Sequence, residues 1–263
     1  MSRSRVREAA AELRRFGVEA PAAGIVLGSG LSSFVDGLAG PMSLPLAELP
    51  GAPVTSVGGH RGAVVRGSLA GREVVALAGR VHYYEGRGVD EVAFGVRLLA
   101  ELGVETLILT NASGGIDTGF SVGDLVLIAD QIGLIWGRAV PGETFRAAGA
   151  YSKRLRALAR DAAFDAGVPV RDGVYLGVLG PSYETPAEIA FARRTGASCI
   201  GMSTVTEAAE AHRLGLELLG VALVTNIPLP GRAEETTHDE VLASGRTGAK
   251  RLLSLVSGVL ERL

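Results

Sequence analysis

Five stretches of small and polar residues, each placed directly after an apolar run, are the features that most constrain how this chain can fold. The clearest follows the run at residues 106–109 and reads Thr110-Asn111-Ala112-Ser113-Gly114-Gly115-Ile116. Small residues and paired glycines after a buried strand let backbone N–H groups approach a ligand closely. In an open α/β sheet, ligands bind beyond the carboxyl ends of the strands. The stretch alone is compatible with a binding site or a plain tight turn, and the four similar stretches favour the binding site.

Composition narrows the class of protein. The 263 residues are 47% hydrophobic and 21% charged, with a formal net charge of -2. This is an ordinary globular composition, and its charge argues against nucleic acid or an anionic membrane as the main partner. A single cysteine, Cys199, excludes a disulfide framework and suits a reducing compartment. Because we find neither a signal-peptide core at residues 2–16 nor an apolar run of about 18 residues, we expect a cytoplasmic protein without a membrane span.

Alternating strand and helix patterns predict the fold. Apolar runs indicate strands at residues 23–27, 63–69, 73–78, 106–109, 125–129, 173–179, 198–200 and 216–224. Helical spacing appears between them, for example at 89–102 and 151–166, and a capping box of Thr237 and Glu240 makes His238 the first residue of the last helix. No repeat or linker divides the chain. We therefore expect one α/β domain over residues 1–263, with a mixed β-sheet surrounded by helices.

Two further stretches have the residues of an anion site. Gly28-Ser29-Gly30-Leu31 turns sharply out of a predicted strand, and so short a loop suits one phosphate held by N–H groups and the Ser29 hydroxyl. A dinucleotide fingerprint would need a glycine at Ser33. Arg80 and His82 are two residues apart, so on an extended backbone they point to the same side and suit an oxyanion. The alternative for this pair is an exposed, salt-bridging edge.

Several other chemistries lack their motifs. The sequence contains no G-x-x-x-x-G-K-[ST] run and no serine in G-x-S-x-G, which argues against a P-loop nucleotidase and a nucleophile elbow. The histidines form no close pair and have no flanking cysteines, so we expect no metal site; they are His60, His82, His212 and His238.

Seven segments, taken in order along the chain, carry a family resemblance. They are Gly28-Ser29-Gly30-Leu31, Gly59-His60-Arg61-Gly62, Gly79-Arg80-Val81-His82-Tyr83-Tyr84-Glu85-Gly86, Thr110-Asn111-Ala112-Ser113-Gly114-Gly115, Tyr183-Glu184-Thr185, Gly201-Met202-Ser203-Thr204-Val205 and Thr225-Asn226. Together they strongly resemble the trimeric class of purine nucleoside phosphorylases. The resemblance implies that family's fold, the phosphorolysis of inosine and guanosine, and a homotrimer.

The resemblance also implies roles for individual residues. Phosphate is expected at positions Ser29, His60, Arg80, His82, Ser203 and the backbone N–H of Ala112. The base is expected against Tyr183, Glu184 and Asn226. The ribose is expected against Met202, with Tyr84 near its 3′-hydroxyl and His238 near its 5′-hydroxyl. The catalytic roles fall to Asn226, Glu184 and His82.

The implied chemistry needs no metal or organic cofactor, and inorganic phosphate is a co-substrate. Cleavage of the N-glycosidic bond builds positive charge on the ribose and negative charge on the leaving purine, so positioned phosphate serves as nucleophile and counter-charge. Asn226 can donate to N7 of the purine while its oxygen accepts from a protonated neighbour, and Glu184 can accept from N1–H of guanine or hypoxanthine.

Two alternative functions remain open at this point. A phosphorylase of 5′-methylthio nucleosides has the same fold, although an imidazole at His238 suits a hydroxyl better than a thioether. A binding protein without catalysis is the other alternative.

Two segments depart from the family pattern. Residues 136–150 are shorter than the family's segment, and Phe145 is the nearest candidate there for the aromatic that covers a neighbour's ribose. After Asn226, Ile227-Pro228-Leu229-Pro230 replaces an alanine- and glycine-rich turn.

Overall fold

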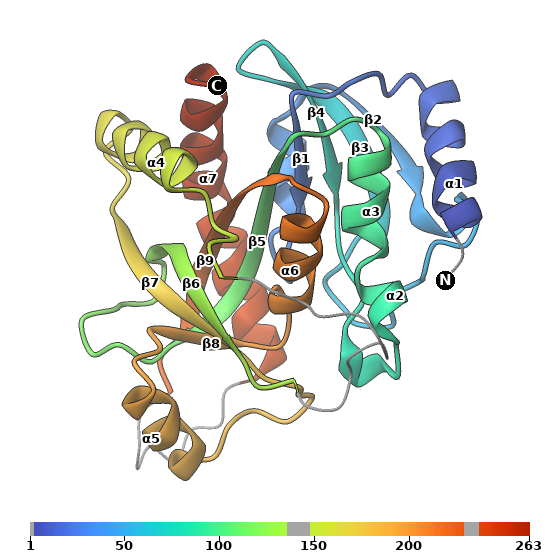
Figure 1. Cartoon of the computed structure of the whole chain (residues 1–263). Helices are drawn as coiled ribbons and strands as arrows, with labels where there is room; N and C mark the ends of the chain where they lie inside the picture. The colour runs from blue at the N-terminus through green and yellow to red at the C-terminus, as the bar shows by residue number, and fades with distance from the viewer. Residues whose placement is uncertain (1–2, 136–147, 229–236) are drawn as a thin grey trace.

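The computed structural model describes residues 3–135, 148–228 and 237–263 (Figure 1). In these ranges the strands form one sheet in the order β2-β3-β4-β1-β5-β8-β7-β6-β9. The strands are β1 Ala23–Val26, β2 Ala39–Pro45, β3 Ala63–Leu69, β4 Arg72–Leu77, β5 Thr106–Gly115, β6 Leu125–Gly133, β7 Val170–Gly177, β8 Cys199–Gly201 and β9 Glu217–Asn226. The α-helices are α1 Arg3–Arg15, α2 Val89–Val92, α3 Phe94–Glu101, α4 Lys153–Asp165, α5 Pro186–Arg194, α6 Val205–Arg213 and α7 His238–Glu261. Short 3₁₀ turns lie at η1 Ser32–Gly37, η2 Leu46–Glu48 and η3 Tyr83–Glu85.

The sheet is mixed, as the sequence predicts. β1 pairs in parallel with both β4 and β5, while β2, β3 and β4 form an antiparallel meander at one edge. β5 also pairs in parallel with β9, and this pairing closes β5, β8, β7, β6 and β9 into a ring. The chain is therefore a single α/β fold whose open and closed parts share β5.

Helices cover both faces of the sheet (Figure 1). On one face, α1, α3 and α6 pack on the strands through residues such as Leu13, Phe94 and Ala208. On the other face, α4 and α7 contribute Leu155 and Val256 to a second apolar cluster. Burial of both faces explains why the central strands are continuous apolar runs without polar alternation.

The expectation that the strand at residue 106 ends at residue 109 is wrong. β5 continues to Gly115, and its register with β9 runs from Thr106 opposite Glu217 to Gly114 opposite Asn226. Gly114 and Gly115 also pair with β8. Backbone pairing on both sides outweighs the low strand propensity of asparagine, serine and glycine. The polar stretch is thus the paired second half of a strand rather than a loop.

Two other elements differ from the sequence predictions. β2 was not expected, because it is an exposed edge strand without apolar alternation. The helix expected at 89–102 is divided at Ala93 into α2 and α3. The predicted start of the last helix at His238 is confirmed, because Thr237 caps α7. Thr185 caps α5 in the same way, together with Glu188.

The turn after β1 is seated directly on α7. Gly30 has a φ of +75°, in the left-handed region that favours glycine, and a Cβ at Gly245 of α7 would lie 2.8 Å from the Gly30 Cα. A Cβ at Gly28 would lie 2.7 Å from the Asn111 Cα of β5. These close approaches fix the position of Ser29 between the sheet and the last helix.

Candidate functional site

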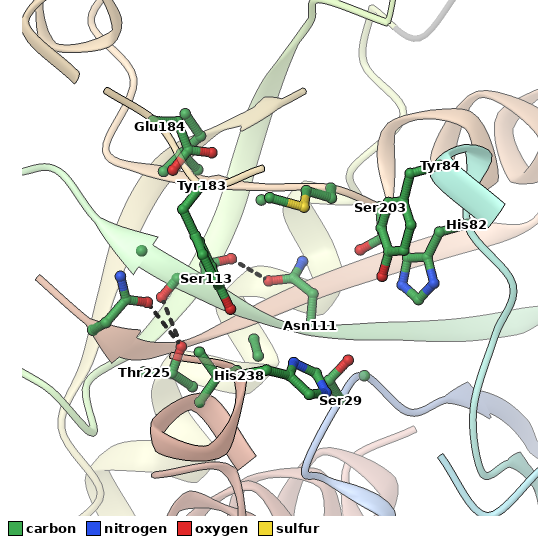
Figure 2. Close-up of a pocket in the computed structure, with 18 of the residues that line it drawn as sticks. Ser29, His82, Tyr84, Asn111, Ser113, Tyr183, Glu184, Ser203, Thr225 and His238 are labelled. Atoms are coloured by element: carbon green, nitrogen blue, oxygen red, sulfur yellow. Dashed lines mark hydrogen bonds between the residues drawn. The ribbon is translucent and has the colours of Figure 1, made fainter. Parts of the chain in front are cut away.

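One pocket lies where the carboxyl ends of the strands meet, and it brings together eleven of the twelve predicted side chains and backbone groups. They are Ser29, Arg80, His82, Tyr84, Ala112, Tyr183, Glu184, Met202, Ser203, Asn226 and His238. In Figure 2, Glu184 and Tyr183 lie toward one end of the pocket, and Ser203, Tyr84 and His82 lie toward the other. The twelfth residue, His60, does not line this pocket but contacts Ser29 behind it.

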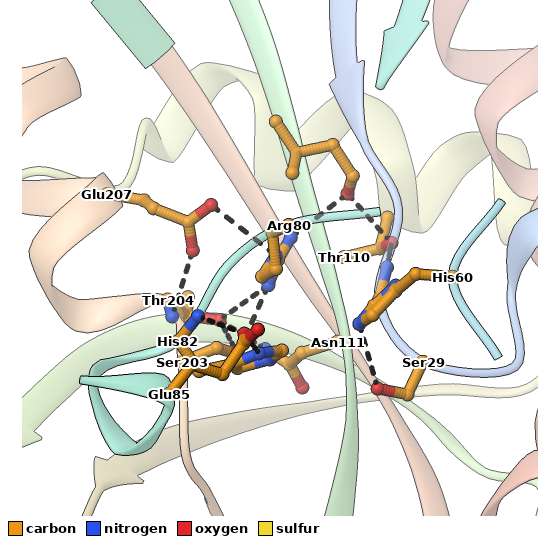
Figure 3. Close-up of polar contacts among 12 residues, drawn as sticks. Ser29, His60, Arg80, His82, Glu85, Thr110, Asn111, Ser203, Thr204 and Glu207 are labelled. Atoms are coloured by element: carbon orange, nitrogen blue, oxygen red, sulfur yellow. Dashed lines mark hydrogen bonds and ion pairs between the residues drawn. The ribbon is translucent and has the colours of Figure 1, made fainter. Parts of the chain in front are cut away.

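Arg80 is the cation of this pocket, and it is buried. Its Nη1 donates to the Ser203 Oγ at 3.1 Å, and its Nη2 donates to the Val26 carbonyl at 3.3 Å. Its Nε lies 3.4 Å from a Glu207 carboxylate oxygen (Figure 3). The exposed salt-bridging edge considered for Arg80 and His82 is therefore wrong, because both residues are buried and line the pocket.

His82 is held by a carboxylate that the sequence reasoning did not use. Its Nδ1 lies 3.0 Å from the Glu85 Oε1, and its backbone N–H donates to the same oxygen. Burial, followed by the nearby Arg80 charge, lowers the pKa of His82 to about 4. A neutral imidazole beside a carboxylate must carry its proton on Nδ1, so Nε2 is left as an acceptor. Glu85 could have been found from its position three residues after the histidine.

Glu85 is itself held by the segment before β3. Its carboxylate accepts from the Ser56 backbone N–H at 2.6 Å and from the Thr55 hydroxyl at 3.1 Å. Burial acts to raise the pKa of Glu85, but the hydrogen bonds from Ser56 and His82 outweigh it and lower that pKa. The carboxylate therefore stays ionised and fixes the imidazole.

His60 lies behind the pocket, next to Ser29 and His82. Its Nε2 lies 3.3 Å from the Ser29 Oγ, and its ring centroid lies 5.5 Å from that of His82. Burial, and then the charges of His82 and Arg80, lower the pKa of His60 to about 3. The ring is thus neutral and orients the Ser29 hydroxyl.

A chain of hydrogen bonds along β5 joins the two ends of the pocket. The Asn111 Nδ2 donates to the Thr204 Oγ1 at 2.9 Å, and the Ser113 Oγ donates to the Asn111 Oδ1 at 2.6 Å. The Thr225 Oγ1 lies 3.3 Å from the Ser113 carbonyl and 3.2 Å from the Asn226 Oδ1. The sequence reasoning assigned no role to Asn111, Ser113, Thr204 or Thr225. For Asn111 and Ser113 the signal was alternation, since residues two apart on a strand share a face.

The paired glycines have different surroundings. Gly114 lines the pocket, as the sequence predicts. A Cβ at Gly115 would instead lie 2.7 Å from the Ile227 side chain and 2.9 Å from that of Val224. Gly115 therefore serves packing, and Ile227, in the turn that departs from the family pattern, lies against β5.

The remaining pocket residues combine aromatic faces with polar tips. The Tyr84 ring stacks on His82 at 4.8 Å between centroids. Tyr183 is exposed at the pocket mouth, while burial raises the pKa of the half-buried Glu184 beside it. The His238 Nε2–H donates to the Gly58 carbonyl at 3.0 Å, which ties α7 to the segment before β3.

Phe145 and Leu229-Pro230 lie outside the described residues. Among the residues that the structure does describe, no group of three or more His, Cys, Asp or Glu side chains could hold a metal ion. Within the same ranges, no helix is long and apolar enough to cross a membrane.

Comparisons with known proteins agree with this architecture. The sequence profile of the Phosphorylase superfamily matches residues 22–261. The chain is 40% identical over 271 residues to purine nucleoside phosphorylase 1 of Geobacillus stearothermophilus, covering 100% of this chain and 99% of the relative. It is 41% identical to the purine nucleoside phosphorylase of Mycobacterium tuberculosis, covering 90% and 88%. The crystal structure of the Schistosoma mansoni purine nucleoside phosphorylase in complex with inosine superposes with a TM-score of 0.92 at 33% identity, covering 100% and 97%.

The two neutral histidines predict an acid-sensitive fold. Because folding lowers their pKa from about 6.5 to about 3 for His60 and about 4 for His82, the unfolded chain binds more protons below pH 6.5. The contribution of the two neutral histidines to the free energy of unfolding is therefore fully present above about pH 6.5. It is lost as the pH falls toward 4, at about 1.4 kcal/mol per pH unit for each histidine. Thermal melts of His60→Gln between pH 7 and 5 should show a shallower decline than the parent. His212→Gln, at an exposed position, should follow the parent, and parallel curves for all three proteins would contradict the assignment.

Proposed function

Because this chain belongs to the phosphorylase superfamily, we propose that the pocket at its strand ends is where it cleaves purine nucleosides with phosphate. The chain is an enzyme that converts purine nucleosides such as inosine and guanosine, with phosphate, into free base and ribose 1-phosphate. One observation carries the proposal for the site. A buried arginine for an anion and an amide–carboxylate pair suited to a purine face the same pocket.

We assign the phosphate to the end of the pocket around Arg80. The Arg80 guanidinium, the Ser203 and Ser29 hydroxyls and the backbone N–H of Ala112 are its donors. The lone pair on the His82 Nε2 suits the proton of a hydrogenphosphate ion, because Glu85 keeps the imidazole proton on Nδ1. His60 acts through Ser29, whose hydroxyl it contacts.

The base is assigned to the opposite end. The Thr225 hydroxyl beside the Asn226 Oδ1 supports the orientation in which the amide nitrogen is the donor toward N7 of the purine. Glu184 accepts from N1–H of a 6-oxopurine, and Tyr183 lies against the ring. Between the two ends, Tyr84, Met202 and His238 are assigned to the ribose, with Tyr84 near the 3′-hydroxyl and His238 near the 5′-hydroxyl.

The reaction follows from this arrangement. A phosphate oxygen forms a bond to C1′ while the C1′–N9 bond breaks and its electron pair passes to the purine. The proton carried by hydrogenphosphate ends on the released base, so atoms and charge balance with phosphate as the only co-substrate. Phosphate beneath C1′ stabilises the positive charge that develops on the ribose, and Asn226 stabilises the negative charge on the purine.

The assembly and location are also proposed. We propose that residues 1–263 act as one domain, supported by the continuous sheet, and assemble as a homotrimer, supported by near full-length similarity to the family. The single, buried Cys199 is consistent with work in the cytoplasm. If sedimentation shows that the protein is a fully active monomer at assay concentration, the trimer is excluded. If the activity is recovered outside the cytoplasmic fraction, the cytoplasmic location is excluded.

A direct assay tests the proposed function. Inosine incubated with the protein and phosphate should release hypoxanthine, and omission of phosphate should abolish the release. Arsenate should replace phosphate, since the same donors bind either tetrahedral anion. Tight nucleoside binding without any base release would identify a binding protein, and a preference for 5′-methylthio nucleosides would identify the sister activity.

Asn226 and Glu184 together predict selectivity for 6-oxopurines. Adenine has no hydrogen on N1, so it would present an acceptor to the Glu184 carboxylate, and mismatched buried hydrogen bonds discriminate by as much as about 10⁴- to 10⁵-fold. We expect inosine and guanosine to be cleaved and adenosine barely. Asn226→Asp should raise the adenosine-to-inosine ratio of kcat/KM, because an acid there can accept from the 6-amino group. The measurement is kcat/KM for the three nucleosides with both proteins, and an unchanged ratio would remove Asn226 as the base reader.

A further inference from the structure

Glu207 is a buried carboxylate for which the motifs and the reaction above provide no role. It lies in the first turn of α6, and its side chain is 4% exposed. Its Oε1 lies 3.4 Å from the Nε of Arg80, whose side chain is also 4% exposed (Figure 3). Among the described residues, this is the ion pair of the pocket's arginine.

The carboxylate is anchored on its other side. Its Oε2 accepts from the Thr204 backbone N–H at 3.0 Å, as part of the capping box that begins α6. Burial raises the pKa of Glu207, whereas the Arg80 charge and the Thr204 N–H act in the opposite direction. Helix α6 thus fixes Glu207, and Glu207 in turn restrains the guanidinium.

Each of the three guanidinium nitrogens has a neighbour in this arrangement: the two terminal nitrogens form hydrogen bonds, and Nε lies at ion-pair distance from a carboxylate without a hydrogen bond. Nε faces Glu207, Nη1 donates to Ser203, and Nη2 donates to the Val26 carbonyl. A planar guanidinium held on three sides presents its remaining N–H groups in a fixed direction, which is what bidentate recognition of an oxyanion requires.

A second cavity lies beside the Arg80–Glu207 pair, so the restraint on the guanidinium has a consequence for where Arg80 points. It has a volume of about 310 Å³ and is bordered by Arg80 and Glu207 together with apolar residues such as Val81, Val92 and Phe94. Arginine has a long side chain with several rotatable bonds, so it needs a restraint to keep one orientation. Without the carboxylate, this cavity would offer the guanidinium room to turn away from Ser203.

We propose that Glu207 is a positioning residue for phosphate: it aims the Arg80 guanidinium at the anion and keeps it out of the neighbouring cavity. The inference rests on the phosphate site proposed above. It predicts that the loss of Glu207 weakens the binding of phosphate much more than the binding of nucleoside, because Glu207 does not line the pocket that holds the base and ribose.

The same helix offers a matched control. Glu210 lies one turn further along α6, its side chain is 0% exposed, and it pairs with Arg97 and Arg213, each at 2.6 Å. None of these three residues lines the pocket. A general loss of a buried carboxylate–arginine pair should therefore affect Glu210→Gln as much as Glu207→Gln.

The experiment compares these two variants with the parent. In Glu207→Gln, the KM for phosphate should rise about tenfold, while the KM for inosine should stay within about twofold. In Glu210→Gln, both KM values should stay at the parent's, even where its thermal midpoint falls. Glu207→Asp, which keeps the charge, should restore part of the phosphate affinity. If Glu207→Gln does not fold, the pair Glu207→Asp and Glu210→Asp provides the same comparison.

A double variant tests whether Glu207 acts through Arg80. In the Arg80→Ala background, Glu207→Gln should produce no further rise in the KM for phosphate. Equal phosphate KM values in Glu207→Gln and Glu210→Gln, or a full additional effect in the Arg80→Ala background, would overturn the inference. A parent protein that releases base without phosphate would instead overturn the phosphorolytic function, so the two failures are distinguishable.

Discussion

The pairing of β5 on both of its edges is the constraint on which the rest of the structure depends. Its first half lies between β1 and β9, and its last residues pair with β8. One strand thus belongs to the open sheet and to the closed ring, and it brings the ends of both to one place. Asn111, Ala112, Ser113 and Gly114 line the pocket from this strand, so the centre of the site is as rigid as the sheet itself.

Much of this could be predicted from the sequence, because apolar runs followed by polar stretches locate the strand ends. Ser29, Arg80 and Asn226 meet since the carboxyl ends of parallel strands lie at one edge of a sheet. Contacts such as that between Arg80 and Ser203, 123 residues apart, depend on strand order and were beyond the sequence pattern. The extension of β5 was missed because pairing with β9 overrides local propensity, and β2 was missed because an exposed edge strand has no apolar alternation.

The end of the pocket to which we assign the phosphate carries no net positive charge. Arg80 is partnered by Glu207, and burial keeps His60 and His82 neutral. On that assignment, phosphate recognition depends on the number and direction of hydrogen-bond donors more than on bulk electrostatic attraction. Such a site selects for the geometry of a tetrahedral oxyanion and is less sensitive to salt than a cluster of exposed lysines or arginines would be.

Thr204 shows what this arrangement demands of the backbone. Its φ of +71° and ψ of -51° are unusual for a β-branched residue, and such conformations cost on the order of 1–3 kcal/mol. Glycine would relieve that strain, but it would remove the hydroxyl that Asn111 and Arg80 both contact. The loss of these buried hydrogen bonds would cost about as much as the strain that glycine relieves, so the strained backbone is retained for the side chain that joins Asn111 to Arg80.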